Sequence, residues 1–488
     1  MKPGPLLSRA ERSLRGDSMR LFPDTVPDGR EALVSDTGER VLYGTLKSDC
    51  AAFSRSVPER CLVLMLCDNS TEAVRFYVAA LYADCVPLLL DENLYPDYLR
   101  EYCRLYRPRL IWAPTSREAL VSPLGRICFR AQGHILVRTE QEDVRLHPEL
   151  ALLLTTSGST GNPKVVRLSR RNITENTKAI IDAIRLDESA RGVTTLPMNY
   201  SYGMAICNMH LFVGATLLVT KRKAMDPLFG DWIRRERITD IQGVPFLYEM
   251  LDKLGFFASL PDSLRLATMG GGKARESLQE KMNEVFAERG VRFYALYGQT
   301  EGTTMLTKLP DDQEMNDPNC IGVACLGMQA RTDPETGELI FTGSSVCMGY
   351  AEKADDLSRG DENHGLLRTG DLAEIDRSGR IYLVGRLSRF LKMSGVRVNL
   401  DDIENLALRT LSEGECACCG RDNDLHLFVS GPCDPSEIKR VIFRAARISA
   451  TMLSVHRIGR LPRQANGKVD YQQLNRLIPD RAQGAGRE

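Results

Sequence analysis

TTSGSTGNPKVV, from Thr155 to Val166, is the stretch of this chain that says most about its fold. Gly158 and Gly161 can adopt positive φ and let backbone N–H groups converge on an anion, and Lys164 adds a mobile positive charge. The loop also offers hydroxyl donors from Thr156, Ser157, Ser159 and Thr160. This composition predicts a phosphate-binding loop, and a Ser/Thr/Gly surface turn without a ligand is the alternative.

The loop is flanked by two apolar segments, Leu152–Thr155 and Val165–Leu168, each short enough to be a strand. The GxxxxGK[ST] spacing of a Walker A loop is missing, and that motif joins a strand to a helix rather than to a second strand. Downstream, Ser169 can cap a helix whose isoleucines share one face, namely Ile173, Ile180, Ile181 and Ile184. Apolar runs that alternate with helical stretches in this way predict α/β layers.

Length and charge narrow the class of protein. A chain of 488 residues is too long for one compact core. Its 64 basic and 64 acidic residues give a formal net charge of zero, so we expect no nucleic acid and no anionic membrane as partner. The first residues, MKPGPLLSRAERSLRG, lack the apolar core of a signal peptide, and the longest apolar runs are strand-sized. We therefore expect a cytoplasmic protein with no integral membrane segment.

Near Arg386 the alternation of strands and helices gives way to short strands. Asn399 can then cap a helix, and a last helix is expected to begin at Pro435. The fold class is therefore predicted to be α/β. It combines a large layered α/β N-terminal domain, residues 1–385, with a small α+β C-terminal domain, residues 386–488.

Fourteen cysteines without an export signal are expected to be reduced thiols. Cys416, Cys418 and Cys419 lie upstream of His426 and Cys433, which suggests metal ligands as one interpretation. Their spacing matches no common zinc site, so we interpret these cysteines as compact apolar residues of the small domain.

Three more segments follow the loop in order: YGQTEGTT (Tyr297–Thr304), RTGDLAEIDRSGRIYLVGR (Arg368–Arg386) and LPRQANGKVDY (Leu461–Tyr471). Together with the loop they resemble the motifs of the adenylate-forming superfamily of acyl-CoA synthetases, peptide-synthetase adenylation domains and beetle luciferases. The resemblance implies a small domain that rotates on a hinge. It also implies ATP-dependent activation of a carboxylic acid as an acyl-adenylate, with release of pyrophosphate. Transfer to a phosphopantetheine thiol, on coenzyme A or a carrier protein, would follow.

The resemblance also implies roles at the nucleotide. The Thr156–Lys164 loop would hold the β- and γ-phosphates of ATP, Thr300 would donate to the α-phosphate, and Glu301 would bind Mg²⁺. The other implied contacts are Tyr297 stacked on adenine, Gly270 and Gly271 in the adenine pocket, Asp371 at the ribose hydroxyls, and Arg386 at the ribose or phosphates. The alternatives are a helix cap for Thr300 and Glu301, a plain turn for the glycines and surface ion pairs for Asp371 and Arg386.

Lys468, in an Asn-Gly-Lys-Val-Asp turn, is implied to be the catalytic residue that meets the substrate carboxylate and the α-phosphate during adenylation. A solvated surface lysine is the alternative. Two positions depart from the family pattern: Val165 stands where glycine is usual, and Ser388 stands where Asp or Lys is usual.

The segment LPMNYSYGM (Leu196–Met204) resembles the acyl-binding motif of the family. Tyr200 would lie at the floor of the acyl pocket, and Tyr202 would follow on the same face of an extended segment. Ordinary buried core residues are the alternative for both tyrosines. Members that activate α-amino acids carry an aspartate where this chain has Asn199. Because a neutral amide pairs poorly with an ammonium group, we expect a plain carboxylic acid as substrate.

Three alternatives to an acyl-thioester-forming ligase stay open at this stage. They are a stand-alone amino-acid adenylating enzyme, an oxidative light-producing enzyme and a catalytically silent acyl- or nucleotide-binding protein. The presence together of Lys164, Glu301, Asp371 and Lys468 argues against the silent protein, which would need none of them.

Overall fold

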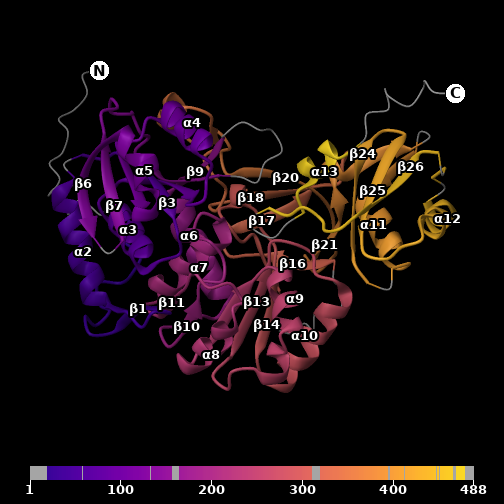
Figure 1. Cartoon of the computed structure of the whole chain (residues 1–488), viewed down its shortest axis with the longest axis horizontal. Coiled ribbons are helices and arrows are strands. Elements are labelled where there is room, and N and C mark those ends of the chain that lie inside the picture. Colours follow the sequence, from indigo (N-terminus) through magenta and orange to yellow (C-terminus); the bar gives the residue numbers. More distant parts are fainter. Residues whose placement is uncertain are drawn as a thin grey trace. The chain divides into compact units, whose positions relative to one another are not determined.

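The computed structural model of the chain describes residues 19–57, 59–131, 133–155, 164–309, 319–393, 396–411, 413–446, 448–449, 451–464 and 469–478. The chain forms two compact units. The first comprises Met1–Ala330, Ile340–Leu367 and Arg377–Arg380, and the second comprises Arg331–Leu339, Arg368–Asp376 and Ile381–Glu488. Figure 1 labels their helices and strands.

An eight-stranded sheet lies in the first unit. Its strands are β3 (Leu62–Cys67), β4 (Val86–Asp91), β5 (Leu110–Pro114), β6 (Gly125–Ala131), β7 (His134–Thr139), β8 (Leu150–Thr155), β9 (Val165–Ser169) and β19 (Tyr350–Ala351). Their order is β19-β9-β8-β4-β3-β5-β7-β6. The central strands β3, β4 and β8 pair in parallel and are almost wholly buried, which explains their uninterrupted apolar sequences.

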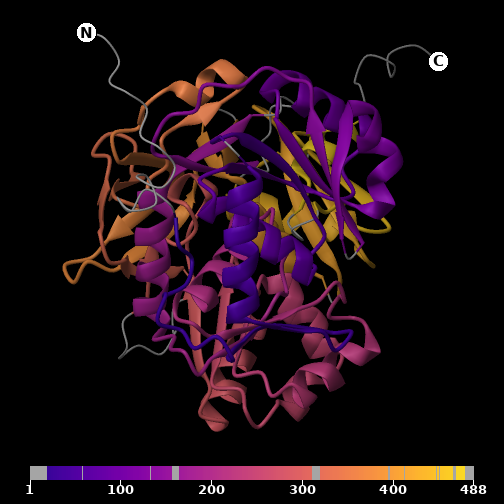
Figure 2. The same cartoon turned by 90° about the vertical axis from the view of Figure 1, so that its left-hand side faces the viewer.

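Nine helices of the described residues belong to the first unit. They are α2 (Tyr43–Ser56), α3 (Thr71–Tyr82), α4 (Pro96–Tyr106), α5 (Glu118–Val121), α6 (Arg170–Ile184), α7 (Ser201–Phe212), α8 (Pro227–Arg235), α9 (Pro245–Lys253) and α10 (Glu276–Glu288). Helices α2 and α3, drawn in indigo, pack side by side (Figure 2). The start of α6 is a capping box: Ser169 Oγ accepts from Asn172 N at 3.0 Å, and Asn172 Oδ1 accepts from Ser169 N at 2.8 Å. The cap predicted at Ser169 is therefore confirmed.

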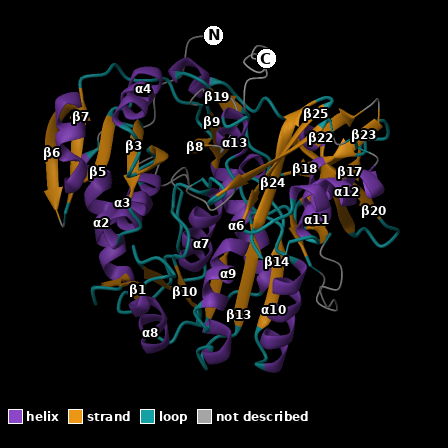
Figure 3. Cartoon of the chain, turned by 45° about the vertical axis from the view of Figure 1, so that its right-hand side comes forward, coloured by secondary structure: helices purple, strands orange, loops and turns teal. Residues whose placement is uncertain are grey.

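Two smaller sheets also lie in the first unit. One has the order β10-β11-β1-β2, with β1 (Glu31–Ser35), β2 (Arg40–Leu42), β10 (Arg191–Val193) and β11 (Thr216–Val219). The other has the order β12-β13-β14, with β12 (Asp240–Gly243), β13 (Leu266–Gly270) and β14 (Arg292–Leu296). Figure 3 shows β13 and β14 alongside α9 and α10. Because β12, β13 and β14 are parallel, their carboxyl ends meet at one edge, and Gly270 ends β13 there.

The second unit is an α+β structure with its own apolar cores. Its elements are β20 (Leu366–Ile375), β21 (Ile381–Arg386), β22 (Phe390–Met393), β23 (Val396–Asn399), β24 (Glu415–Arg421), β25 (Asp424–Ser430), β26 (Leu453–Ile458), α11 (Leu400–Leu408), α12 (Pro435–Ala446) and α13 (Tyr471–Arg476). Asn399 Oδ1 accepts from Asp401 N at 3.0 Å, so Asn399 caps α11 as predicted. A helix begins at Pro435, but it is not the last one: Asp470 caps the short α13, which buries Leu474.

The remaining elements are short. They are the strands β15 (Thr307–Lys308), β16 (Cys320–Ala324), β17 (Met328–Thr332) and β18 (Glu338–Gly343), and the 3-10 helices η1 (Thr115–Arg117), η2 (Ser122–Leu124), η3 (Phe256–Ser259), η4 (Thr300–Gly302), η5 (Ala354–Ser358) and η6 (Leu387–Arg389). The layered α/β class is confirmed. The division into working domains at 385/386 and the rotation of the small domain stay predictions.

All fourteen cysteines are free thiols. Cys416 and Cys418 are buried in one apolar cluster of the second unit, together with Ile403 and Ile442. Cys419, from the same strand β24, is buried in a second apolar cluster. These thiols therefore serve as small apolar core residues.

Candidate active site

The predicted phosphate loop connects β8 to β9, an antiparallel pair in which Thr155 lies opposite Val165. Both flanking strands are as predicted. The loop residues Thr156, Ser157, Gly158, Ser159, Thr160 and Gly161 lie outside the described residues, so their role stays a prediction. Val165 is fully buried in β9, where a β-branched residue suits a strand.

Lys164, at the end of the loop, lies over an aromatic ring. Its Nζ is 4.0 Å from the centroid of the Tyr350 ring. The Tyr350 hydroxyl in turn donates to Glu301 Oε1 at 2.7 Å. Burial raises the pKa of Tyr350, and the neighbouring Glu301 carboxylate raises it further, so the phenol stays protonated and remains a donor. Tyr350 thus joins the predicted loop lysine to the predicted metal ligand.

Tyr350 is held by a buried arginine. Strand β19 pairs with β9, with Tyr350 opposite Val166. Arg167, which has no exposed surface, donates to the carbonyls of Tyr350 at 3.1 Å and Met348 at 2.9 Å. It also donates to the Arg359 carbonyl at 2.6 Å and pairs with Glu362 at 2.5 Å. Burial lowers the pKa of Arg167. One guanidinium therefore fixes the whole strand that carries Tyr350.

Replacing Arg167 with methionine is expected to lower the free energy of unfolding by about 3 kcal/mol, because three carbonyls and one carboxylate lose their donor. Urea unfolding followed by circular dichroism measures the change. Arg171→Met is the matched control, since Arg171 is exposed on the adjacent helix α6, and it is expected to cost less than about 0.5 kcal/mol. Equal losses in the two variants would contradict the anchoring role of Arg167.

The segment that carries Thr300 and Glu301 is tied to two other predicted segments. Thr300 Oγ1 donates to Ser201 Oγ at 3.4 Å, and Thr304 Oγ1 donates to the Ser201 carbonyl at 3.1 Å. Asn176 of α6 donates from Nδ2 to the Met305 carbonyl at 2.7 Å. These bonds join the YGQTEGTT segment to the LPMNYSYGM segment and to the helix that follows the phosphate loop.

Tyr297 and Gly298 have contacts within the protein itself. The Tyr297 ring stacks on Phe341, with 6.3 Å between the ring centroids. A Cβ on Gly298 would lie 1.6 Å from the Thr304 carbonyl oxygen, so the fold alone already requires glycine there. The Tyr297-Gly298 pair is thus explained by packing, and its contact with adenine stays a prediction.

The predicted acyl-binding and adenine-binding residues meet. A Cβ on Gly271, which has φ +83°, would lie 2.6 Å from Tyr200 Oη. A Cβ on Gly270 would lie 3.4 Å from Tyr202 Cε1, and the Tyr202 hydroxyl is within 2.6 Å of Thr268 Oγ1. Burial raises the pKa of Tyr200 to about 12. The two tyrosines therefore pack beneath the glycines at the carboxyl end of β13.

One expectation for this segment is wrong. Tyr202 is not on an extended strand but in the first turn of α7, whose residues Ser201–Leu211 are all buried. The apolar residues Met204, Ile206 and Met209 occupy all sides of the helix, so the helical period is hidden in the sequence. Tyr200 and Tyr202 still point to neighbouring glycines, because Tyr200 lies just before the helix and Tyr202 lies within it.

Two buried polar atoms of this region have no hydrogen-bond partner among the described residues: Asn199 Oδ1 and Gln299 Nε2. The backbone before Asn199 is fixed, since Asn69 donates to the Leu196 carbonyl at 3.1 Å and accepts from Met198 N at 3.0 Å. An unsatisfied buried acceptor and donor are costly unless a ligand completes them. Asn199 was predicted from the sequence, and Gln299 was not.

Asp371 and Arg386 both belong to the second unit. They are opposite each other on the β20–β21 hairpin, and Arg386 Nε donates to Asp371 Oδ1 at 2.5 Å. Thr369 Oγ1 accepts from Asp371 N at 3.1 Å. The structure therefore pairs these two predicted nucleotide contacts with each other. Lys468 lies outside the described residues, as does the side chain of Ser388.

Tyr350, Asn176, Ser201 and Gln299 were missed by sequence analysis. Only Asn176 had a usable signal, because Asn172 and Asn176 recur four residues apart on the isoleucine face of α6, where polar side chains need partners. No group of three His, Cys, Asp or Glu side chains in the described part of the chain could hold a metal ion by itself. Within the same part, no helix is long and apolar enough to cross a membrane.

The sequence matches the AMP-binding enzyme family over residues 23–351. The chain belongs to this family and is an adenylate-forming ligase. It is 26% identical, over 85% of its length, to a hybrid PKS-NRPS synthetase of Gloeophyllum trabeum, of which it covers 28%. It is 24% identical, over 86% of its length, to the 2-succinylbenzoate–CoA ligase of Bacillus cytotoxicus, of which it covers 89%.

A solved structure with the same fold is ATP-bound MatB from Rhodopseudomonas palustris. The two share 21% sequence identity at a TM-score of 0.78, over 94% of this chain and 97% of MatB. At this identity the likeness establishes the fold and leaves the substrate open.

Proposed function

We propose that this protein activates a carboxylic acid with ATP as an acyl-adenylate, releases pyrophosphate, and transfers the acyl group to a phosphopantetheine thiol. The observation that carries the proposal is the convergence of sequence-distant segments in the first unit. Lys164 contacts Tyr350, Tyr350 contacts Glu301, Thr300 contacts Ser201, and Tyr200 contacts Gly271.

The chemistry requires charge screening. A carboxylate oxygen attacks the α-phosphorus of ATP, the bond to the bridging oxygen breaks, and pyrophosphate leaves. Because both reactants are anionic, cations and hydrogen-bond donors lower the barrier. Lys164 and the loop would take the β- and γ-phosphates, Thr300 the α-phosphate, and Lys468 the meeting point of carboxylate and phosphorus.

A magnesium ion fits the residues present. Glu301 is a single carboxylate with one oxygen held by Tyr350, and Mg²⁺ is commonly bound by one or two carboxylates together with substrate phosphates and waters. When bound, the ion would neutralise phosphate charge. The Tyr350 hydroxyl would orient the carboxylate toward it, as outer-sphere donors do for metal ligands.

Replacing Tyr350 with phenylalanine is expected to raise the Mg²⁺ concentration for half-maximal pyrophosphate release by about tenfold, since such donors are worth roughly 10–100-fold in metal affinity. Tyr350→Phe keeps the ring under Lys164, whereas Tyr350→Leu removes ring and hydroxyl and is expected to raise the KM for ATP as well. A magnesium titration at saturating ATP separates the two effects. An unchanged magnesium requirement in Tyr350→Phe would show that the hydroxyl does not serve Glu301.

Asn199 is proposed to face the acyl group, because its Oδ1 is a buried acceptor without a protein partner. Its neutral amide favours a plain acid over an α-amino acid. Asn199→Asp is expected to shift preference toward acids with an α-ammonium by about tenfold, since a charged hydrogen bond is worth roughly 1.5–3 kcal/mol, and to weaken the native acid. Ratios of kcat/KM for matched acids with and without the amino group measure the shift. An unaltered ratio would show that Asn199 does not contact the acyl group.

A panel assay tests the proposed function. The purified protein is given ATP, Mg²⁺ and a range of carboxylic and amino acids, with and without coenzyme A, and the products are separated. AMP and pyrophosphate are expected with the preferred acid, and a thioester when the acceptor is coenzyme A. Thioester only with a phosphopantetheinyl carrier protein would select that acceptor. Formation of ADP and phosphate would contradict the proposal, because attack would then be at the γ-phosphate.

A further inference from the structure

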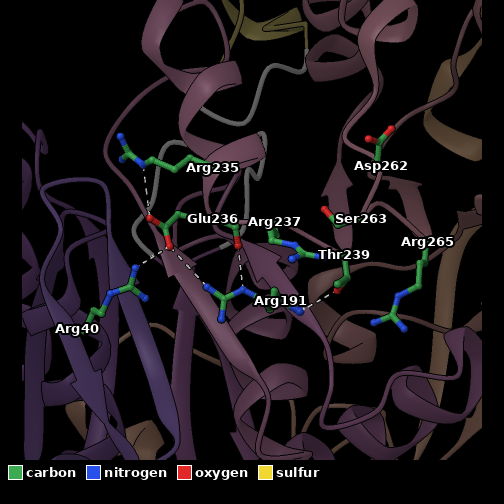
Figure 4. A pocket seen from close by; sticks show the side chains of 9 residues that line it. All are labelled: Arg40, Arg191, Arg235, Glu236, Arg237, Thr239, Asp262, Ser263 and Arg265. Atoms are coloured by element: carbon green, nitrogen blue, oxygen red, sulfur yellow. Dashed lines mark hydrogen bonds and ion pairs between the residues drawn. The ribbon is translucent and has the colours of Figure 1, made fainter.

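A hollow lined by five arginines lies in the first unit, away from the candidate active site. Its lining residues are Arg40, Arg191, Arg235, Glu236, Arg237, Thr239, Asp262, Ser263 and Arg265, and its volume is about 590 Å³. Figure 4 shows these side chains. The family motifs account for none of them.

The hollow is at the opposite edge of the parallel strands from the glycines of the active site. Arg191 begins β10, and Thr239 and Arg265 directly precede β12 and β13. Gly270, by contrast, ends β13. Four residue steps along an extended strand span about 13 Å, so the ends of β13 belong to separate sites.

Two of the arginines are neutralised within the protein. Arg40 pairs with Glu31 at 2.5 Å and with Glu236 at 3.0 Å. Arg191 pairs with Glu31 at 3.1 Å and with Glu236 at 3.6 Å. In Figure 4 the dashed lines meet at Glu236, which also pairs with Arg235 at 3.6 Å. This network of Glu31 and Glu236 holds Arg40 and Arg191 in place and leaves little negative charge for the other arginines.

The remaining arginines have fewer carboxylates close to them. Arg237 and Arg265 are exposed, and neither forms an ion pair with a described carboxylate. The Arg265 guanidinium donates to Ser189 Oγ at 3.1 Å, and the Ser189 hydroxyl together with the Arg265 charge holds the pKa of the Asp187 carboxyl below its usual range. Besides Glu236, Asp262 is the one carboxylate among the residues that line the hollow with Arg235, Arg237 and Arg265. Like charges gathered in one concave wall repel one another and attract a multivalent anion.

We propose that this hollow binds a small anion with two or more adjacent phosphoryl groups. A guanidinium group binds two phosphate oxygens through a pair of parallel N–H donors. Several arginines spaced around one hollow can therefore contact several linked phosphates, which favours such a chain over a single phosphate. The wall consists of charged and hydroxyl side chains, which suits a hydrophilic ligand. The inference does not rest on the proposed adenylating function.

Calorimetric titration of the full chain with inorganic tripolyphosphate at low salt tests the site. The phosphate loop is a second place where this probe can bind, so the titration is repeated with Lys164→Ala. The double variant Arg237→Gln/Arg265→Gln is expected to bind tripolyphosphate at least tenfold more weakly at the hollow. Lys164→Ala is expected to bind tripolyphosphate at the hollow as the wild type does. Arg126→Gln/Arg289→Gln, which removes two exposed arginines elsewhere in the first unit, is expected to bind as the wild type does.

Titrations with other anions define the ligand. Inorganic phosphate is expected to bind at least tenfold more weakly than tripolyphosphate. If Lys164→Ala binds inorganic pyrophosphate and ATP equally well, the site recognises the phosphates alone. If it binds ATP more tightly, the ligand is a nucleotide. Either result supports the site. Unchanged tripolyphosphate binding by a folded Arg237→Gln/Arg265→Gln variant, or equal weakening by the control pair, would overturn it. Thermal unfolding verifies that each variant is folded.

Discussion

Lys468→Ala is expected to slow acyl-AMP formation by roughly 10²–10³-fold, because a positive charge is lost where the carboxylate meets the α-phosphate. Transfer of the acyl group from chemically prepared acyl-AMP to the thiol is expected to change by less than about threefold. By resemblance to its family, the small domain would have rotated by that stage and taken Lys468 away from the site. Single-turnover measurement of each half-reaction separates the two effects.

Lys439→Ala is the control for this variant. Lys439 also lies in the second unit, on α12, so the substitution removes the same charge from the same unit. Both half-reactions are expected to proceed at wild-type rates. If Lys468→Ala slows both half-reactions equally, Lys468 has a structural role. If both proceed at wild-type rates, Lys468 takes no part in the mechanism.

Glu301→Gln is expected to lower kcat/KM for adenylation by at least about 100-fold. Glutamine keeps an oxygen that accepts from the Tyr350 hydroxyl, so the local contact with Tyr350 survives. It loses the negative charge that a magnesium ligand needs. The control is Glu352→Gln. Glu352 is exposed and lies two residues after Tyr350, so this variant is expected to be as active as the wild type. Normal activity of Glu301→Gln at limiting magnesium would exclude Glu301 as the metal ligand.

Much of the fold was accessible from local sequence. The β8–β9 pair follows from two apolar segments around a loop, and α6 follows from Ser169 with isoleucines at helical spacing. Tyr202 was misplaced because α7 is buried on every side and therefore shows no polar face. Helix α13 was missed because a helix of 6 residues is too short to show a period.

The candidate site was only partly predictable, because its contacts join residues far apart in the chain. Glu301 has a motif around it, but its partner Tyr350 is recognisable only when β19 is placed beside β9. Glycine is required at position 298 because the Thr304 carbonyl lies against it, and this close approach is visible only in the folded chain. The arginine hollow has no linear motif, since its residues come from four separate segments between Arg40 and Arg265.

The central claim is attack of the substrate carboxylate on the α-phosphate, and isotope transfer measures it directly. The preferred acid is labelled with ¹⁸O in its carboxylate and carried through one complete reaction with ATP and the thiol. Because the thiol displaces AMP from the acyl carbon, one labelled oxygen is expected in the phosphate of AMP and none in pyrophosphate. Labelled inorganic phosphate with ADP, or AMP free of label, would contradict the account.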